Sequence, residues 1–524
     1  MTWSRRRFLG LAGGVTIAGA GALGLGSCGV SELGATLSLR GQTGNLLRSN
    51  LELPEAFGIP LPIPPVAEPT RTDARTDYYQ ITQRGAQVEI IPGTRTRIMG
   101  YDGIFPGPTV VSRSGRRTVI RHRNDLSVPV SVHLHGGHTP AESDGGPIDL
   151  ILPHAGWKPA HSHGGIAMPL GDTTVGYRDH TYPMNQRAAT LWYHDHRMDF
   201  TGAQVYRGLA GFHLVHDDEE EALPLPRGER DIPLMVCDRA FEANGAFRYP
   251  GLDRTLQQEP GVLDDYMEGV LGDVLLVNGA PWPELEVDAA LYRFRILNAS
   301  NARRYRFRLD GTEMVQIGGD GGLLEKPIRH ERIDAAPAER FDVLVDFSGF
   351  RPGDTVVLSN ELGEERTTEV MRFRVKRKVR EDDARIPTAL STIEKLDPAR
   401  AVRTRDWHFA RGNVNGTQGW LINDKPFDPK RMDARPKLGD IEIWRFTSDV
   451  HHPIHIHLDP FQVLRRNQDG PSDYDRGWKD TADLAPSEVL EVAIRFQDYT
   501  GPYMLHCHNL EHEDMAMMSA FETR

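Results

Sequence analysis

The segment that most constrains this chain runs from His506-Cys507-His508 through His512 to Met517. A single cysteine lies between two histidines, a third histidine follows five residues after the cysteine, and a methionine follows five residues after that. A cysteine thiolate, imidazoles and a weakly bound thioether are the ligands of a mononuclear blue-copper centre. The segment supplies all of these except a second imidazole, which must come from elsewhere in the chain.

The residues before this segment predict a β-strand. Gly501-Pro502 is a turn signal, and the bulky apolar run Tyr503-Met504-Leu505 follows it. Successive side chains of a strand point to opposite faces, so Cys507 points one way while His506 and His508 point the other. A copper ion on Cys507 therefore has a short covalent path to whatever His506 and His508 hold.

The composition favours a turn-rich β protein over a helical bundle. The chain has 524 residues, with 52 Gly and 36 Pro, and few segments show helical periodicity. This length is enough for about two to four domains with ample core. The net charge of −12 argues against nucleic acid as a partner.

The three cysteines are Cys28, Cys237 and Cys507. Cys507 is assigned to copper, and Cys237 follows the apolar run Ile232-Pro233-Leu234-Met235-Val236, which predicts a buried strand thiol. With Cys28 in the N-terminal targeting segment, no disulfide is expected.

Residues 1–28 are predicted to be an export signal rather than part of the fold. Ser4-Arg5-Arg6-Arg7-Phe8-Leu9 resembles the twin-arginine motif, and an apolar Gly/Ala-rich run follows it. Leu25-Gly26-Ser27-Cys28 also resembles a bacterial lipoprotein cleavage box, with Cys28 as the lipidated residue. The alternative is a chance cysteine near an ordinary cleavage site. We expect a protein at the cell envelope or outside the cell, with lipidation of Cys28 as a route to membrane attachment.

The remaining chain divides into a tether and three domains. Residues 29–75 contain the proline-rich run Leu61-Pro62-Ile63-Pro64-Pro65, which predicts an extended tether. The acidic run Asp217 to Glu221 is expected to be a solvated connector, and Lys376 to Leu396 a second linker. These breaks give domains at residues 76–218, 229–378 and 400–524.

Paired histidines occur in the first and third domains only. Each terminal domain carries a His-x-His pair on a predicted strand, then a second such pair about fifty to sixty residues later. Internal repetition of this kind implies duplicated domains. The pairs are His133 and His135, His194 and His196, His455 and His457, and His506 and His508.

With these motifs the sequence strongly resembles the multicopper oxidases of the three-domain type, from about residue 76 to 524. Leu191-Trp192-Tyr193-His194-Asp195-His196, His133-Leu134-His135-Gly136-Gly137 and Leu510-Glu511-His512-Glu513-Asp514 resemble the branch of bacterial spore-coat laccases and bilirubin oxidases. The resemblance implies an all-β fold of three cupredoxin-like Greek-key sandwich or barrel domains.

The resemblance also implies four copper ions per chain. The mononuclear blue copper takes His452, Cys507, His512 and Met517. The single copper of a trinuclear cluster takes His133 and His455. The coupled pair of that cluster takes the other six histidines, which are His135, His194, His196, His457, His506 and His508.

The implied reaction couples one-electron oxidation of phenols, aminophenols or bilirubin-type pigments to four-electron reduction of dioxygen to water. One alternative is a metallo-oxidase acting on Cu(I) or Mn(II), although the 14 methionines form no rich insert. An alternative of another class is a cupredoxin scaffold without catalysis, which the complete set of ligand positions argues against. We expect a monomer whose partners are dioxygen and a small aromatic or metal-ion donor.

By the same resemblance, two acidic residues match positions to which a proton-relay role is assigned in the spore-coat branch, Asp144 in Glu142-Ser143-Asp144-Gly145 and Glu513 after His512. A carboxyl group near the cluster can supply the protons that water formation consumes. The alternative for each is a group that only orients a histidine.

The first domain's long loop is unusually rich in histidine. These residues could line a second metal site or could be solvent-exposed. They are His138, His154, His161, His163 and His180.

Overall fold

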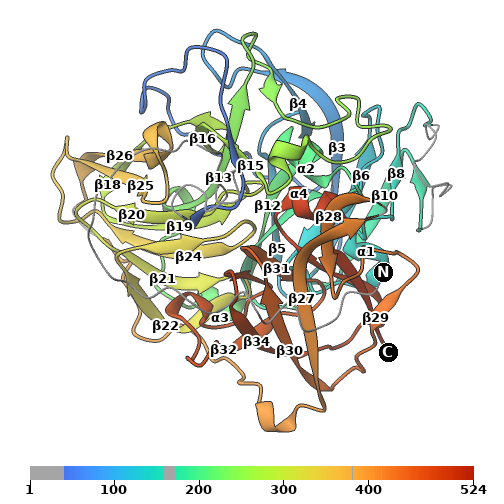
Figure 1. The fold of residues 1–524 in the computed structure, drawn as a ribbon. Helices are drawn as coiled ribbons and strands as arrows, with labels where there is room; N and C mark the ends of the chain where they lie inside the picture. Colours follow the sequence, from blue (N-terminus) through green and yellow to red (C-terminus); the bar gives the residue numbers. More distant parts are fainter. Residues whose placement is uncertain (1–40, 158–170, 380–381, 415) are drawn as a thin grey trace, which may run out of the picture. The chain divides into compact units, whose positions relative to one another are not determined.

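A computed structural model describes residues 41–157, 171–379, 382–414 and 416–524 of the chain (Figure 1). The predicted export signal, Cys28, His161 and His163 lie outside these residues. Most regular structure is β-strand, which confirms the all-β prediction. The α-helices of the described residues are short: α1 (Ala141–Asp144), α2 (Thr201–Tyr206), α3 (Asp218–Glu221) and α4 (Leu510–Asp514).

The first domain is built from two sheets that enclose an apolar core. One sheet has the strand order β10-β6-β3-β2, with β4 paired to β3, and the other has the order β5-β12-β11-β7. The strands are β2 (Arg71–Thr72), β3 (Thr76–Val88), β4 (Thr96–Tyr101), β5 (Gly107–Arg113), β6 (Arg117–Asn124), β7 (Val132–His135), β10 (Tyr177–Tyr182), β11 (Ala189–Asp195) and β12 (Ala210–His216). A small parallel pair, β8 (Ile151–Leu152) and β9 (Thr174–Val175), lies in the long loop.

The second domain is also a pair of sheets. The larger has the order β17-β16-β13-β19-β24-β21-β22, with β14 paired to β13, and the smaller has the order β18-β26-β25-β20-β23. The strands are β13 (Asp231–Phe241), β14 (Phe247–Arg248), β16 (Val274–Val277), β17 (Ala280–Pro281), β18 (Glu284–Ala289), β19 (Leu291–Asn298), β20 (Tyr305–Leu309), β21 (Met314–Gly319), β22 (Gly322–His330), β23 (Ile333–Ala335), β24 (Arg340–Asp346), β25 (Thr355–Asn360) and β26 (Glu369–Lys378). Cys237 is buried within β13, as predicted.

The third domain repeats the pattern with the orders β28-β27-β30-β34-β32 and β29-β36-β35-β31-β33. The strands are β27 (Arg403–Val414), β28 (Thr417–Ile422), β29 (Met432–Ala434), β30 (Ile441–Ser448), β31 (His452–Ile456), β32 (Phe461–Arg466), β33 (Thr481–Leu484), β34 (Val489–Arg495), β35 (Gly501–Cys507) and β36 (Met518–Thr523). Its core includes Cys507 and Met517.

The three domains share the same pairing scheme. In one sheet of each domain two strands run parallel, namely β3 with β6, β13 with β19, and β27 with β30. The other sheet also holds a parallel pair, which is β5 with β12, β18 with β26, or β29 with β36. Hairpins join only antiparallel neighbours, so each parallel pair requires a chain crossover between the sheets. The repeated scheme supports domain duplication.

The proline-rich segment differs from the predicted tether over its described part. β1 (Asn45–Leu47) runs parallel to β15 (Val270–Gly272), and Leu47 and Leu61 are buried. Pro60 and Val66 form isolated bridges to Glu284 and Thr109. Because the segment buries apolar side chains against two domains, residues 45–66 act as a strap.

The acidic run Asp217 to Glu221 was predicted as a solvated connector, and this is wrong for Glu220. Asp217 caps the N-terminus of α3, which turns Glu220 inward. Its carboxylate is buried, contacts Arg293 and Arg295 of the second domain, and lies 2.7 Å from His216 Nδ1. The two arginine partners lie 73 and 75 residues away in the sequence, so composition alone could not reveal them.

This contact predicts unequal effects of two neighbouring substitutions. Glu220→Ala leaves two buried guanidinium groups short of one partner and should lower the free energy of unfolding by about 3 kcal/mol. Glu221→Ala is the matched control, because Glu221 pairs with Arg113 at the surface and should cost less than about 1 kcal/mol. Denaturant unfolding of both variants checks this, and equal losses would contradict the assignment of Glu220.

Candidate metal centre

Four strands bring the paired histidines together. In the first domain β7 and β11 are antiparallel neighbours, with His133 opposite His194. In the third domain β31 and β35 are antiparallel neighbours, with His455 opposite His506. Opposite residues of neighbouring strands point to the same face. All eight predicted histidines are fully buried and contact one another: His133, His135, His194, His196, His455, His457, His506 and His508.

The ring nitrogens of these histidines converge at distances that suit metal ions. His133 Nε2 lies 3.4 Å from His455 Nε2, and His506 Nε2 lies 3.3 Å from His196 Nε2 and 3.2 Å from His457 Nε2. Imidazole nitrogens bind first-row metal ions at about 2.0–2.1 Å, so two of them at a tetrahedral angle are about 3.3–3.4 Å apart. The residues therefore fit metal ions held between the two terminal domains.

Hydrogen bonds on the outer ring nitrogens hold most of these imidazoles in one orientation. The Nδ1 atoms of His133 and His455 lie 2.6 and 2.9 Å from the main-chain oxygens of Asp144 and Asp480. The His457 Nδ1 lies 2.8 Å from Asp144 Oδ2. A ring nitrogen that donates its proton outward leaves the Nε2 lone pair free for a metal.

His135 has the opposite orientation. Its Nε2 lies 3.0 Å from Asp480 Oδ1, and its buried Nδ1 has no partner among the described residues. The Nδ1 lone pair is therefore the one that faces the cluster.

Other polar atoms in the cluster also lack partners among the described residues. They are His194 Nε2, His196 Nδ1 and both ring nitrogens of His508. Buried polar groups are almost always hydrogen-bonded, because an unpaired one loses its hydration without compensation. Such a concentration of unpaired nitrogens fits a site that binds several metal ions.

A second ligand set lies on the other face of β35. Cys507 Sγ is 3.4 Å from His452 Nδ1 and 3.6 Å from His512 Nδ1, and these two nitrogens are 3.1 Å apart. A thiolate binds a metal at about 2.3 Å and an imidazole at about 2.0 Å, so their donor atoms lie about 3.5 Å apart. One thiolate and two imidazoles at these distances fit a blue-copper ion.

The surroundings of this second set restrict access to it. His452 Nε2 lies 3.0 Å from Asp449 Oδ1, and His512 Nε2 lies 3.2 Å from the main-chain oxygen of Glu268. The indole of Trp420 stacks on the His512 ring, with centroids 3.8 Å apart. Both histidines are completely buried, so a donor molecule cannot contact either ring directly.

Met517 is buried in the same apolar cluster as Cys507. Its main-chain oxygen accepts a hydrogen bond from the Cys507 N–H at 3.2 Å. Of the neighbouring methionines, Met518 belongs to another cluster and Met515 is only partly buried. The axial role of Met517 stays a prediction that its position favours.

Burial controls the protonation of these ligands. It lowers the pKa of His196 to about 4 and that of His194 to about 3, and it also lowers the pKa values of His452 and His512. Neutral imidazole is the form that binds metal. Burial raises the pKa of Cys507, so the thiolate needs a bound cation to stabilise it.

Both predicted acidic residues contact the histidine cluster. Asp144 is buried in α1 and holds His457, while its Oδ1 atom lies 3.6 Å from His133 Nδ1 and has no hydrogen-bond partner among the described residues. Glu513 is buried in α4, with Oε2 3.2 Å from His506 Nδ1 and Oε1 3.8 Å from His196 Nε2. Both groups therefore orient histidines, whatever else they do.

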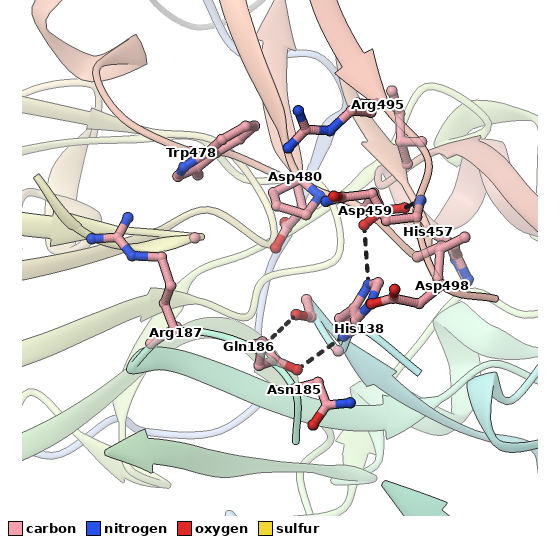
Figure 2. Close-up of a pocket in the computed structure, with 18 of the residues that line it drawn as sticks. His138, Asn185, Gln186, Arg187, His457, Asp459, Trp478, Asp480, Arg495 and Asp498 are labelled. Carbon is pink, nitrogen blue, oxygen red and sulfur yellow. Dashed lines mark hydrogen bonds and ion pairs between the residues drawn. The ribbon is translucent and has the colours of Figure 1, made fainter. Parts of the chain in front are cut away.

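A cavity of about 330 Å³, lined mainly by residues of the first and third domains, reaches the cluster (Figure 2). His133, His455 and His457 line part of it, and Trp478, Arg187 and Arg495 line other parts. Asp480 also lines the cavity. Because three histidines of the cluster form part of its wall, the cavity gives solvent-sized molecules a route towards them.

His138, at the wall of this cavity, is neither solvent-exposed nor free to bind a metal. Its Nδ1 lies 3.0 Å from Asp459 Oδ1 and its Nε2 lies 2.9 Å from Asp498 Oδ2 (Figure 2). Burial alone would lower the pKa of His138, but the two carboxylates outweigh it and raise the pKa to about 9. His138 is therefore a clamp between the first and third domains.

The other loop histidines that the structure describes form no second metal site. His154 is exposed, and His180 is buried against the rings of His122 and Tyr182. No group of metal-ligand type among the described residues includes His138, His154 or His180.

Sequence reasoning missed several residues that hold the ligands. Except for Asp449, which lies three residues before His452, they are distant in sequence from the histidines and belong to no motif. Only Asp449 could have been noticed from the sequence. The missed residues are Glu268, Arg340, Trp420, Asp449, Asp480 and Thr481.

Comparisons with known proteins agree with this geometry. Family models described as multicopper oxidase match residues 83–163, 256–371 and 394–524. A laccase of Bacillus stratosphericus is 35% identical over 516 residues, covering 88% of this chain and 98% of the relative. A bilirubin oxidase of Albifimbria verrucaria is 33% identical, covering 89% of this chain and 81% of the relative. A solved laccase structure from Pediococcus acidilactici Pa5930 has a TM-score of 0.78 at 30% identity, covering 91% of this chain and 96% of the other.

The thiolate site predicts the outcome of one substitution. Cys507→Ser should remove the intense thiolate-to-copper absorption of the copper-loaded protein, while circular dichroism stays unchanged because serine has a similar size. Cys237→Ser, at the other described cysteine, is the control and should keep the colour. A wild-type protein that loads copper fully but stays colourless would refute the site.

Proposed function

This chain belongs to the multicopper oxidase family, and on that premise we propose that it holds four copper ions and oxidises small aromatic donors with dioxygen. The observation that carries the proposal is the arrangement on β35, where one cysteine lies between two cluster histidines. A laccase-like oxidase needs this arrangement, because its donors give one electron each whereas dioxygen takes four.

In this proposal the ions are divided as follows. His452, Cys507 and His512 would hold the mononuclear copper, with the Met517 thioether as a further weak donor. His133 and His455, whose Nε2 atoms are 3.4 Å apart, hold the single copper of the cluster. The coupled pair is held by His196, His457 and His506 on one side and by His135, His194 and His508 on the other.

When bound, copper supplies one-electron acceptance at the mononuclear site and multi-electron delivery to dioxygen at the cluster. The chain contributes the connection between them. Cys507 is covalently bonded along the backbone to both His506 and His508, so the polypeptide itself would connect the thiolate site with both sides of the cluster. The buried surroundings keep water away from this route.

The donor in this proposal docks above His512 without touching it. Glu268 and Trp420 cover the ring, and the Glu268 carboxylate pairs with Arg411 at the surface, 3.0 Å away. An electron would need to cross only this thin cover, while the donor stays outside. Phenols, aminophenols and bilirubin-type pigments suit such transfer, because their aromatic systems stabilise the one-electron oxidised form.

Protons for water formation are assigned to the two buried carboxyl groups. Burial raises the pKa of Asp144, and the charge of Asp149 adds to this effect, so both favour the protonated carboxyl group. Burial also favours a protonated Glu513, but His506 and His196 outweigh it and lower the pKa of Glu513 to about 2. Two carboxyl groups with pKa values shifted in opposite directions are the usual arrangement of a proton donor and a proton acceptor.

Export and attachment are further parts of the proposal. The twin-arginine motif at Arg5 and Arg6 supports transport of a folded, copper-loaded protein, and Cys28 supports a lipid anchor at the cell envelope. None of the helices that the structure describes has the length and apolar character needed to cross a membrane. We propose that the protein works as a monomer.

Oxygen uptake tests the proposed function. Copper-loaded protein should consume dioxygen with phenols, aminophenols or bilirubin and should release water rather than peroxide. Uptake with Cu(I) or Mn(II) alone would show a metallo-oxidase instead. Copper-loaded protein that consumes no dioxygen with any of these donors would indicate a scaffold, and Cys507→Ser protein measures the background rate.

Asp144 predicts a selective kinetic defect. Asp144→Asn keeps an oxygen that can accept from His457 but removes the titrating group, so copper content and colour should survive. Turnover with saturating phenol should fall at least tenfold, about 1.4 kcal/mol in barrier. Stopped-flow absorption should show normal reduction of the blue copper and slow reoxidation by dioxygen.

Glu142→Gln is the matched control, because Glu142 lies on the same helix and is exposed. It should turn over at the parent rate. Slow reduction with normal reoxidation in Asp144→Asn would instead place Asp144 in donor binding.

A further inference from the structure

Asp480 connects the histidine cluster to the second domain, which contains no paired histidines. Its Oδ1 atom lies 3.0 Å from His135 Nε2, and its main-chain oxygen lies 2.9 Å from His455 Nδ1. Thr481 Oγ1 lies 3.1 Å from the same His135 nitrogen. Asp480 therefore touches one cluster histidine from each terminal domain.

The partner of Asp480 is Arg340, the first residue of β24 in the second domain. Arg340 Nη1 lies 2.7 Å from Asp480 Oδ1, and Nη2 lies 2.5 Å from Oδ2. A forked guanidinium matches a carboxylate through two parallel hydrogen bonds, which fix the carboxylate's direction as well as its charge. Both side chains are buried, at 0% and 6% exposure, so water does not weaken the pair.

The other donors of Arg340 are also occupied. Nε donates to Thr190 O at 3.0 Å, and Nη1 and Nη2 donate to Ala338 O and Asp320 O. Thr190 belongs to β11 of the first domain, so the guanidinium contacts all three domains. An ammonium group has three donors and no fork, so lysine cannot reproduce these contacts.

Among the buried carboxylates near Arg340, Asp480 is the one that forms the two-pronged ion pair with it. Lys479 Nζ lies 3.1 Å from Asp320 Oδ2 and 3.0 Å from Glu339 Oε1. Lys479 thus contacts both other buried carboxylates of this region. Asp320 also lies 3.6 Å from Arg340 Nη1, but the two shortest carboxylate contacts of Arg340 are with Asp480.

Gly136, directly after His135, shows how closely the ion pair packs against the cluster. A Cβ atom at this position would lie 2.7 Å from Arg340 Nη2 and 2.8 Å from Asp480 Oδ2. Gly136 also has φ +83°, which glycine adopts without strain. Glycine at position 136, next to His135, therefore leaves the space that the Arg340–Asp480 ion pair occupies.

We infer that Arg340 is a positioning residue for the histidine cluster, acting through Asp480 on His135. The two ring nitrogens of histidine differ little in shape, so packing alone cannot decide which one faces a metal. Asp480, held in place by Arg340, accepts a hydrogen bond from the Nε2–H group of His135. The Nδ1 atom of the same ring then faces the cluster. This inference rests on the proposed function, since it requires metal at the cluster.

Copper retention tests the inference. Arg340→Lys keeps the charge without the fork, and Arg340→Gln removes both. Partners that orient metal ligands typically change metal affinity by about 10–100-fold. Each variant should therefore lose cluster copper to a chelator about 10–100-fold more readily than the parent, while the blue absorption per chain is unchanged, because Cys507, His452 and His512 make no contact with Arg340 among the described hydrogen bonds.

The matched control is Arg303→Lys. Arg303 is a buried arginine of the same domain that pairs with Asp238 at 2.8 Å, and neither residue is hydrogen-bonded to a ligand histidine among the described residues. It should lower stability without changing the ratio of total to blue copper. Arg340 variants with the parent ratio, or with equal loss of both kinds of copper, would overturn the inference.

A double variant covers the case in which a single Arg340 variant does not fold. Arg340→Gln with Asp480→Asn replaces the buried ion pair by a neutral one of similar size, which proteins tolerate better than one unpaired charge. The same selective loss of cluster copper is expected, because a neutral amide holds His135 weakly, and full retention would contradict the inference. A wild-type protein that binds no copper would instead refute the proposed function.

Discussion

Alternation of side chains along β35 is the constraint on which the rest of the site depends. Cys507 lies opposite Ile454 and faces the core of the third domain, whereas His506 lies opposite His455 and faces the cluster. Because successive side chains of a strand point to opposite faces, neighbouring residues of one strand can belong to two separate sites and still be covalently joined. The shared register of β7 with β11 and of β31 with β35 then brings the remaining histidines to the same place.

The second domain supports both sites without supplying a ligand. Besides the contact of Arg340 with Asp480, it holds α4, the helix that carries His512. Glu511 of this helix accepts hydrogen bonds from Tyr249, Asn301 and the main chain of Val270, at 2.9, 2.8 and 3.1 Å. The positions of the candidate ligands therefore depend on the second domain, whose sequence contains no metal-binding motif.

Local patterns predicted the fold class and the histidines that the structure brings together, whereas contacts between distant segments could not be predicted. Each His-x-His pair is flanked by strand-forming residues, and residues i and i+2 of a strand share a face, so the two histidines of each pair were predicted on one face. Leu61 and Glu220 are buried by partners distant in the sequence, and their own neighbours in the sequence are proline-rich and acidic, respectively. His138 was misjudged for the same reason, since Asp459 and Asp498 lie more than three hundred residues away.

The central claim is that this chain binds one copper ion at Cys507 and three among eight histidines. Anomalous diffraction at the copper edge from crystals of the copper-loaded protein measures this directly. The account predicts four peaks, one within bonding distance of Cys507 Sγ and three between the first and third domains, with His135 bound through Nδ1. A missing peak at Cys507, or fewer than three peaks at full copper occupancy among the histidines, would contradict it.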